Sequence, residues 1–342
     1  MPDSSIPRSG AETDPEPVNA PQPPIQPPFR PPFKPVAGAL TGPAPKGPAA
    51  KGMEPMRAIL LVVLAVACLS CSDATAKYLA RTLPPAEIAW MRYVVFTALV
   101  MPLALRGGPL RVLRTMRPGL QILRGLGMLG SALFFIMAMR HLPLAEAAAI
   151  SFVSPVFVTV LSILLLNEKV GFRRWVALLV GLAGVVIVIR PGADGFQPAV
   201  LLPVLTAFSW ALGLVATRKM TVRESPLTTM VWSALTGLIA LTALLPLHAV
   251  WPTPWEMLLG AFIGLVYTAA QWLLILAYRQ GEASVLAPFT YVQLIWSTAL
   301  GFLVFGAVPD QWTFAGTGVI IASGLYTAHR ERMRARQRRL AA

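Results

Sequence analysis

Several ionisable side chains stand inside long apolar stretches of the sequence, and they are the first candidates for chemistry: Asp73, Lys77, Arg92, Arg124 and Glu146. A charge at the centre of a membrane helix costs about 2.5–3.5 kcal/mol, so each needs an opposite charge, a water-filled cavity or a route to the interface. Asp73 and Lys77 are four residues apart, which places them on one helix face and lets them pair. Asp73 lies about 10 Å from the nearer end of its stretch, too deep to reach the interface. It is therefore suited to holding a cationic group or taking up a proton.

The long basic side chains have a second explanation, because lysine and arginine extend along a helix to reach the membrane surface. For Arg124 this explanation is favoured over contact with a ligand. For Lys77 and Arg92 both explanations remain open, so both residues stay among the candidates for binding.

Polar aromatic and amide side chains form a second set inside the apolar stretches: Trp210, Tyr267, Gln271, Trp272, Tyr291, Gln293 and Trp296. Tyr267 and Gln271 are four residues apart and share a helix face. Such side chains bind a flat, heteroaromatic or zwitterionic molecule by stacking and cation–π contact. An aromatic belt at the membrane surface does not explain mid-stretch Tyr267, Gln271 and Tyr291, whereas hydrogen bonding between helices remains an alternative. The predicted binding residues are Asp73, Lys77, Arg92, Trp210, Tyr267, Gln271, Tyr291 and Trp296.

The elements that must position these residues are apolar runs of about 20 residues, the length of an α-helix that crosses a hydrocarbon core of roughly 30 Å. Of the 342 residues 56% are hydrophobic and 13% charged, against about a quarter charged in soluble chains. Buried helices of soluble proteins are usually shorter and carry a polar stripe. The sequence therefore predicts an all-α integral membrane protein with ten spans, near residues 57–79, 86–105, 119–139, 144–166, 172–190, 197–218, 226–247, 255–278, 283–306 and 309–328.

The two halves of the chain are similar in sequence. A shift of 139 positions without a gap aligns Arg140 with Arg279, Ser151 with Thr290, Phe152 with Tyr291, Phe157 with Trp296, Val180 with Val319 and Ala183 with Ala322. Residues 57–190 and 197–328 are thus predicted to be two copies of a five-helix repeat. Because five spans are an odd number, the second copy should lie upside down relative to the first, as an inverted-topology repeat.

Lysine and arginine gather in alternate loops, which predicts the orientation of the helices. One set of loops and the C-terminal tail hold Arg106, Arg111, Arg114, Arg117, Lys169, Arg173, Arg174, Arg218, Lys219, Arg223, Arg279 and six arginines between 330 and 339, whereas the other set holds Arg81, Arg140 and Arg190. Because cytoplasmic loops are the positive ones, we expect both termini in the cytoplasm and the protein in the inner (plasma) membrane. The net charge of +14 then reflects topology, and no nucleic acid partner is expected.

The two ends of the chain differ from the spans. Residues 1–52 contain 15 of the 32 prolines, which predicts a disordered, proline-rich cytoplasmic tail. Residues 329–342 are predicted to be a basic cytoplasmic tail. The first apolar stretch starts near Arg57, too far along the chain for a cleaved signal peptide, and should be an uncleaved anchor.

Prolines and glycines fall inside the predicted spans. Pro155 and Pro288 each remove a backbone hydrogen bond, so they predict kinks of the kind found at moving or ligand-lined segments. Gly260 and Gly264 form a GxxxG pattern, and further small positions are Gly181, Gly184, Gly316 and Gly318. These glycines predict close helix packing, with a homodimer face as one use of it.

The sequence offers no pattern typical of an enzyme or a metal site. Cys68 and Cys71 lie inside an apolar stretch, and His141, His248 and His329 lie at helix ends without metal-ligand spacing. There is no phosphate-binding loop, nucleophile elbow or pair of catalytic carboxylates. We therefore expect no cofactor, no metal and no catalytic residues. An integral membrane enzyme acting on a lipid-linked substrate remains the alternative.

Four segments resemble the drug/metabolite transporters, which have ten helices and two EamA-type repeats. They are Arg124-Gly125, LPLAEAAAISFVSPVF at 142–157, LLLNEKVGFRRWVALLVGLAGVVI at 164–187 and APFTYVQLIWSTALGFLVFGAVPDQWTFAGTGVIIASGLY at 287–326. The last looks like the branch that includes S-adenosylmethionine and riboflavin uptake proteins. The resemblance covers about residues 57–330. This sequence departs from the family at Ala307, where the second repeat usually carries an acid matching Glu168, which argues against an essential symmetric pair of acids.

The resemblance implies a secondary transporter that moves a small organic metabolite across the inner membrane by alternating access. It also implies a cavity walled by the first, third, fourth, sixth, eighth and ninth spans. The expected partners are then the small-molecule substrate and the lipid bilayer.

Overall fold

The computed structural model describes residues 55–106, 113–168, 170–190, 197–220, 224–245, 250–280 and 283–340. All of them belong to one compact unit, Gly38–Ala342. The predicted proline-rich tail of residues 1–52 lies outside the described residues. The basic residues that follow position 329 continue the last helix as far as residue 340.

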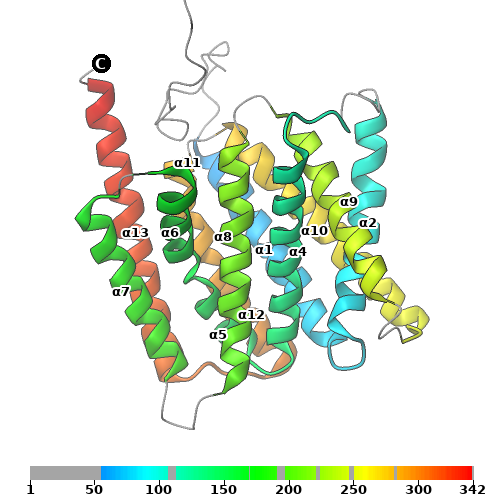
Figure 1. Ribbon diagram of the computed structural model, residues 1–342. Helices are drawn as coiled ribbons and strands as arrows, with labels where there is room; N and C mark the ends of the chain where they lie inside the picture. The colour runs from blue at the N-terminus through cyan, green and yellow to red at the C-terminus, as the bar shows by residue number, and fades with distance from the viewer. Residues whose placement is uncertain are drawn as a thin grey trace, which may run out of the picture. The chain divides into compact units, whose positions relative to one another are not determined.

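The described residues form helices and contain no strand (Figure 1). The elements are α1 (Pro55–Leu79), α2 (Pro85–Arg106), α4 (Pro118–Met139), α5 (Leu144–Ser151), α6 (Ser154–Leu166), α7 (Phe172–Ile189), the 3-10 helix η1 (Pro198–Val200), α8 (Leu201–Lys219), α9 (Pro226–Leu244), α10 (Pro254–Gln280), α11 (Ala283–Leu286), the 3-10 helix η3 (Ala287–Tyr291), α12 (Val292–Phe305) and α13 (Gln311–Leu340). Within these ranges, 8 helical stretches are long and apolar enough to cross a membrane, and a shorter apolar stretch, Trp175–Ile189, lies in α7. The predicted all-α, multi-pass membrane architecture is confirmed at this level.

Prolines mark where helices begin. α2, α4, α9 and α10 all start on a proline, whose missing N–H would have no intrahelical acceptor in the first turn anyway. Pro155 and Pro288 do more than kink a helix. In the first half, α5 ends at Ser151 and α6 begins at Ser154. In the second half, η3 separates α11 from α12. The fourth and ninth predicted spans are therefore broken helices, each interrupted next to its proline.

The two halves share local structure at the same 139-residue offset as their sequences. α6 is capped by Asn167 with φ 53°, and α12 is capped by Gly306 with φ 64°, both left-handed. The next residue closes the same hydrogen bond in each half, from Glu168 N to Ser162 O at 3.3 Å and from Ala307 N to Gly301 O at 3.1 Å. Glycine adopts this conformation freely and asparagine tolerates it, which explains both caps.

Several helix pairs pack in the same way when the two halves are exchanged. α1 packs on α10 as α4 packs on α8, and α2 packs on α10 as α4 packs on α9. α6 packs on α8 as α12 packs on α1. α2 and α9 pack on each other, as do α7 and α13, which lie side by side at the left of Figure 1.

Glycines allow the closest of these contacts. A Cβ added at Gly184 would lie 2.8 Å from the carbonyl oxygen of Gly316, so the backbones of α7 and α13 touch. On α10, a Cβ added at Gly260 would lie 2.6 Å from Met91 Sδ, and one at Gly264 would lie 2.4 Å from Val95 Cβ of α2. These three glycines therefore pack against helices of the same chain, as the prediction of close helix packing requires, and the homodimer stays a prediction.

Candidate functional site

An internal cavity of about 60 Å³ lies between α2, α4, α8, α9 and α10. Its wall contains three of the predicted binding residues, Trp210, Tyr267 and Gln271. The full lining is Tyr93, Phe96, Arg124, Met128, Trp210, Met230, Ser233, Tyr267 and Gln271. A water molecule needs roughly 10–15 Å³ of such volume, so this cavity holds a few waters and is too small for a metabolite.

Aromatic rings build one side of the cavity. Gln271 Nε2 donates to the Tyr267 hydroxyl at 3.0 Å, one helical turn away, as their shared face predicts. The Tyr267 ring meets Phe96 edge to face at 5.5 Å, and Phe96 in turn meets Tyr93 at 6.2 Å. Tyr93 packs against Gly237 of α9, where a Cβ would lie 2.1 Å from its ring. The rings are thus fixed by contacts from both halves of the chain.

Arg92 lies behind the Tyr267 ring, with its guanidinium carbon 4.8 Å from the ring centroid. It is only 4% exposed, and its Nε and Nη2 have no hydrogen-bond partner within the described ranges. Asp73 of α1 is the acid whose charge interacts with Arg92. Among the described residues Asp73 makes no hydrogen bond and no ion pair within 4 Å, so the two charges attract each other without direct contact.

The pairing of Asp73 with Lys77 is not formed. Lys77 Nζ instead donates to the carbonyl oxygens of Met139 at 2.8 Å and Leu142 at 2.5 Å, and it lies 5.6 Å from the Phe305 ring centroid. Met139 is the last residue of α4, where backbone acceptors lack intrahelical partners and the helix dipole is negative, and Leu142 lies in the turn that follows. Lys77 thus satisfies two backbone acceptors between α4 and α5 and makes no ion pair with Asp73.

Arg124, predicted to extend along its helix towards the membrane surface, is hydrogen-bonded to two neighbouring helices. Its Nε donates to Thr217 Oγ1 of α8 at 2.9 Å, and its Nη1 donates to Thr229 O of α9 at 3.3 Å and to Ser233 Oγ. It is therefore a wall residue of the cavity that sequence reasoning missed as a binding candidate. The sequence feature that could have indicated this role is the glycine that follows Arg124. A Cβ at Gly125 would lie 2.7 Å from Thr236 Cβ of α9, so glycine at this position lets α9 come close to α4.

Two predicted binding residues lie elsewhere. Tyr291 stacks on Phe152, with ring centroids 4.9 Å apart and planes 25° from parallel, and a Cβ at Gly324 of α13 would lie 2.0 Å from its hydroxyl. Trp296 is on α12 and is 38% exposed. Neither lines the cavity. Phe152 and Tyr291 are the equivalent positions of the two halves, so the broken helices meet at matching residues.

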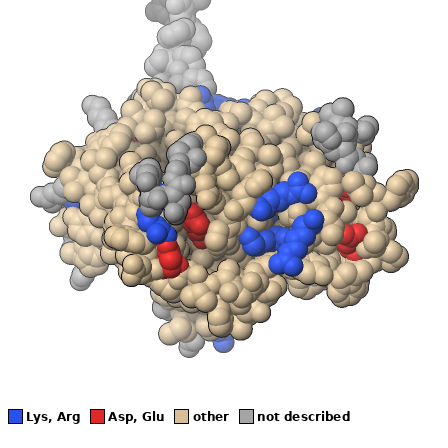
Figure 2. All heavy atoms as spheres, turned by 90° about the horizontal axis from the view of Figure 1, so that it is seen from below, with Lys and Arg blue, Asp and Glu red and all other residues tan. Residues whose placement is uncertain are grey.

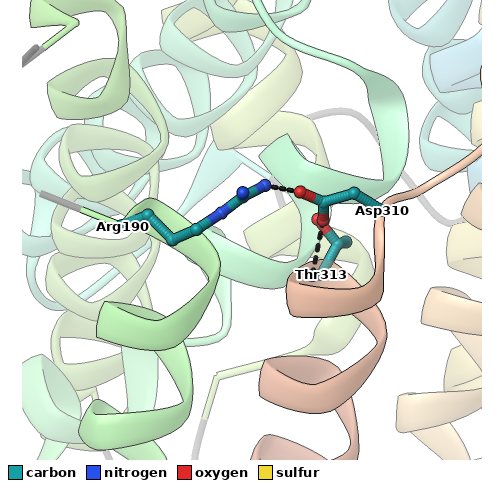
Figure 3. Close-up of polar contacts among 3 residues, drawn as sticks. All are labelled: Arg190, Asp310 and Thr313. Atoms are coloured by element: carbon teal, nitrogen blue, oxygen red, sulfur yellow. Dashed lines mark hydrogen bonds and ion pairs between the residues drawn. The ribbon is translucent and has the colours of Figure 1, made fainter. Parts of the chain in front are cut away.

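Polar contacts close the end of the bundle where α7 ends and α13 begins (Figure 3). Arg190 forms an ion pair with Asp310, and Asp310 Oδ1 also accepts a hydrogen bond from the backbone N–H of Thr313 at 2.8 Å, capping α13. Nearby, Arg140 Nε donates to Ala80 O at 2.9 Å. Figure 2 shows this end from below, with Lys and Arg side chains clustered on a surface that is otherwise mostly uncharged.

A multi-pass membrane protein with a duplicated helical unit and an internal polar and aromatic cavity has the architecture of a secondary transporter. The sequence model of the EamA-like transporter family matches the chain twice, over residues 56–190 and 197–327. The chain therefore belongs to the EamA-like transporter family, and it is a secondary transporter of small metabolites.

Named relatives agree with this assignment. The chain is 29% identical over 270 residues to an S-adenosylmethionine uptake transporter of Rickettsia bellii, covering 79% of this chain and 92% of the relative. It is 32% identical over 294 residues to a riboflavin transporter of Vibrio cholerae serotype O1, covering 84% and 97%. A pseudopaline exporter of Pseudomonas aeruginosa is 28% identical over 274 residues, covering 77% and 92%.

A solved crystal structure shares the fold of the chain. The two superpose with a TM-score of 0.59 at 22% identity, covering 81% of this chain and 98% of the other. At this identity the likeness concerns the fold alone.

Proposed function

We propose that this protein carries a small, flat heteroaromatic metabolite across the inner membrane by alternating access. The observation that carries the proposal is the cavity between α2, α4, α8, α9 and α10, because both halves of the chain contribute its polar and aromatic wall. A site at the interface of two repeats is where secondary transporters bind their substrates. The relatives named for S-adenosylmethionine and riboflavin support a flat ring system as the common element of the cargo.

The topology we propose has ten spans in two inverted repeats, with both termini in the cytoplasm. α7 and α13 occupy the positions of the fifth and tenth predicted spans. The exchange of packing partners between the halves is what a two-fold relation between the repeats requires. The loops with few cations, which hold Arg81, Arg140 and Arg190, face outward under this proposal.

The described conformation is a closed one under this proposal, because a cavity of about 60 Å³ is too small for either candidate metabolite. Separation of the helices at one end at a time would open it alternately to each side. The contacts of Lys77, Arg140, Arg190 and Asp310 close the outward end.

The predicted binding residues have different parts in this mechanism. Trp210, Tyr267 and Gln271 contact the substrate, and Arg92 and Asp73 set the charge behind the Tyr267 ring. Lys77, Tyr291 and Trp296 lie outside the closed cavity and are reached only when the helices separate.

Transport by the purified protein in proteoliposomes tests the proposal. We expect saturable uptake of radiolabelled S-adenosylmethionine or riboflavin that is accelerated by unlabelled substrate on the opposite side. Loss of an aromatic contact is worth about 0.5–1.5 kcal/mol, so Tyr267→Ala should raise KM about 2- to 10-fold. Tyr326→Ala is the matched control, since Tyr326 is 53% exposed on the outside of α13. Absence of saturable uptake for both compounds would count against the proposal, and turnover of a lipid-linked substrate would favour the enzyme alternative.

A further inference from the structure

Arg124 presents part of its guanidinium to the cavity without a protein partner. Of its five N–H donors, Nε and Nη1 supply the bonds to Thr217, Thr229 and Ser233. Within the described part of the chain, Nη2 has no hydrogen bond, and Arg124 is a lining residue. The three existing bonds fix the plane of the guanidinium, so the free edge has a defined direction.

No carboxylate balances this charge. All three acceptors of Arg124 are neutral, and among the described residues it forms no ion pair within 4 Å. Its electrostatic neighbours are the hydroxyl groups of Tyr93 and Tyr267. Glu224 accepts hydrogen bonds from Thr115 Oγ1 at 2.7 Å, Met116 N at 3.1 Å and Gln121 Nε2 at 3.4 Å, and it makes no ion pair with Arg124.

The guanidinium of Arg92, which also lies near the cavity, adds to the excess of positive charge there. Arg92 faces the back of Tyr267, and its charge interacts with the Asp73 carboxylate. Two arginines and one aspartate leave one positive charge around this aromatic pocket. An uncompensated buried charge is costly, and the cost is relieved when an anion enters and accepts hydrogen bonds from it.

We propose that Arg124 binds a carboxylate of the transported metabolite, with the flat ring of that metabolite against Trp210 and Tyr267. This inference rests on the proposed transport function and narrows its substrate class to heteroaromatic compounds that carry a carboxylate. Guanidinium groups bind carboxylates through paired N–H donors, and the fixed orientation of Arg124 lowers the cost of forming them. S-Adenosylmethionine has an adenine ring and a carboxylate, together with an ammonium and a sulfonium group, whereas riboflavin has no anionic group.

The test compares S-adenosylmethionine with its decarboxylated form, which lacks only the carboxylate. Each compound competes for uptake of labelled S-adenosylmethionine by wild-type, Arg124→Gln and Arg124→Lys proteins in proteoliposomes. In the wild type we expect S-adenosylmethionine to bind about 10- to 100-fold more tightly than the decarboxylated compound, the range of a charge-assisted hydrogen bond. Arg124→Gln should remove this difference by weakening only the carboxylate-bearing ligand, and Arg124→Lys should retain part of it. Arg114→Gln is the control, because Arg114 is exposed outside the spans.

A loss of affinity for the carboxylate-bearing ligand alone distinguishes a binding role of Arg124 from a role in folding. A misfolded or loosened Arg124→Gln protein would weaken both ligands alike, and that result would overturn the proposal in favour of a structural role. Equal wild-type affinities for the two ligands would overturn it as well, even if Arg124→Gln did not fold. Wild-type uptake of riboflavin without S-adenosylmethionine would refute the carboxylate site and leave the transport function standing. Failure to transport either compound would refute the function itself.

Discussion

The ion pair between Arg190 and Asp310 should hold the outward end of the transporter closed. It links the end of α7 in the first half to the start of α13 in the second. Asp310 has a second role, since its Oδ1 caps α13 through the N–H of Thr313. Asp310→Asn is therefore the informative change, because asparagine removes the charge and keeps the cap. Arg190→Asn is the matching change on the other side, since Arg190 has φ 46° and asparagine tolerates that conformation.

The solvent exposure of the Arg190–Asp310 ion pair limits the free energy that it contributes. The two side chains are 35% and 38% exposed, so the pair is partly solvated, and a pair of this kind is worth about 0.5–1 kcal/mol. If it forms only in the outward-closed state, its loss should shift the population towards outward-open by about 2- to 5-fold. Asp310→Ala should add the loss of the cap, about 1 kcal/mol more in helix stability.

The assay is labelling of a single cysteine by a maleimide that cannot cross the membrane. Cys68 and Cys71 are first replaced by alanine, and Ser151→Cys is introduced beside the break between α5 and α6. The labelling rate should rise about 2- to 5-fold in Asp310→Asn and in Arg190→Asn, with no further rise in the double variant. An unchanged rate in both single variants, together with a faster rate in Asp310→Ala, would refute the reasoning and assign Asp310 to capping alone.

Three further outcomes are expected. Gly316→Ala should lower the thermal stability of the detergent-solubilised protein, since its Cβ would lie 2.5 Å from Gly184 O, at a cost of about 1–3 kcal/mol; Gly318→Ala, which meets nothing within 4 Å, should not. If Asp73 carries a proton, Asp73→Asn should keep the exchange of internal for external substrate and lose accumulation driven by the pH gradient. If Asp73 holds the substrate, exchange and accumulation should fall together. Normal exchange and normal accumulation would leave Asp73 a structural role. Reporters fused after Arg117 or at the C-terminus should lie in the cytoplasm, and a reporter near Pro143 outside; a periplasmic C-terminal reporter would contradict the ten-span topology.

The helices could be predicted because their causes are local. Length, apolar composition and proline position define each stretch, so the predicted span 119–139 differs by one residue from α4 at Pro118–Met139. The shared cap at Asn167 and Gly306 follows from the same repeat that aligned the two halves. The spacing of four residues predicted that Tyr267 and Gln271 share a helix face, and their hydrogen bond confirms it.

The partners of the charged side chains could not be predicted because they are tertiary. Sequence spacing offered Lys77 only Asp73, whereas the fold brings the carbonyl end of α4 within its reach. Arg124 was expected to extend to the surface, and the acceptors that hold it come from α8 and α9, more than 90 positions away. Tyr291 is a residue type suited to binding a flat molecule, but in the fold its ring stacks on Phe152.

The stack of Phe152 on Tyr291 also bears on how such a chain arose. If the two halves descend from one gene, these equivalent positions once held the same residue. A residue that meets its own copy is the mark of a contact on the two-fold axis of a homodimer. The ancestor would then have been a five-span protein that inserted in both orientations and joined through this contact. Fusion of the genes would have freed the two sides to differ, as Phe152 and Tyr291 now do.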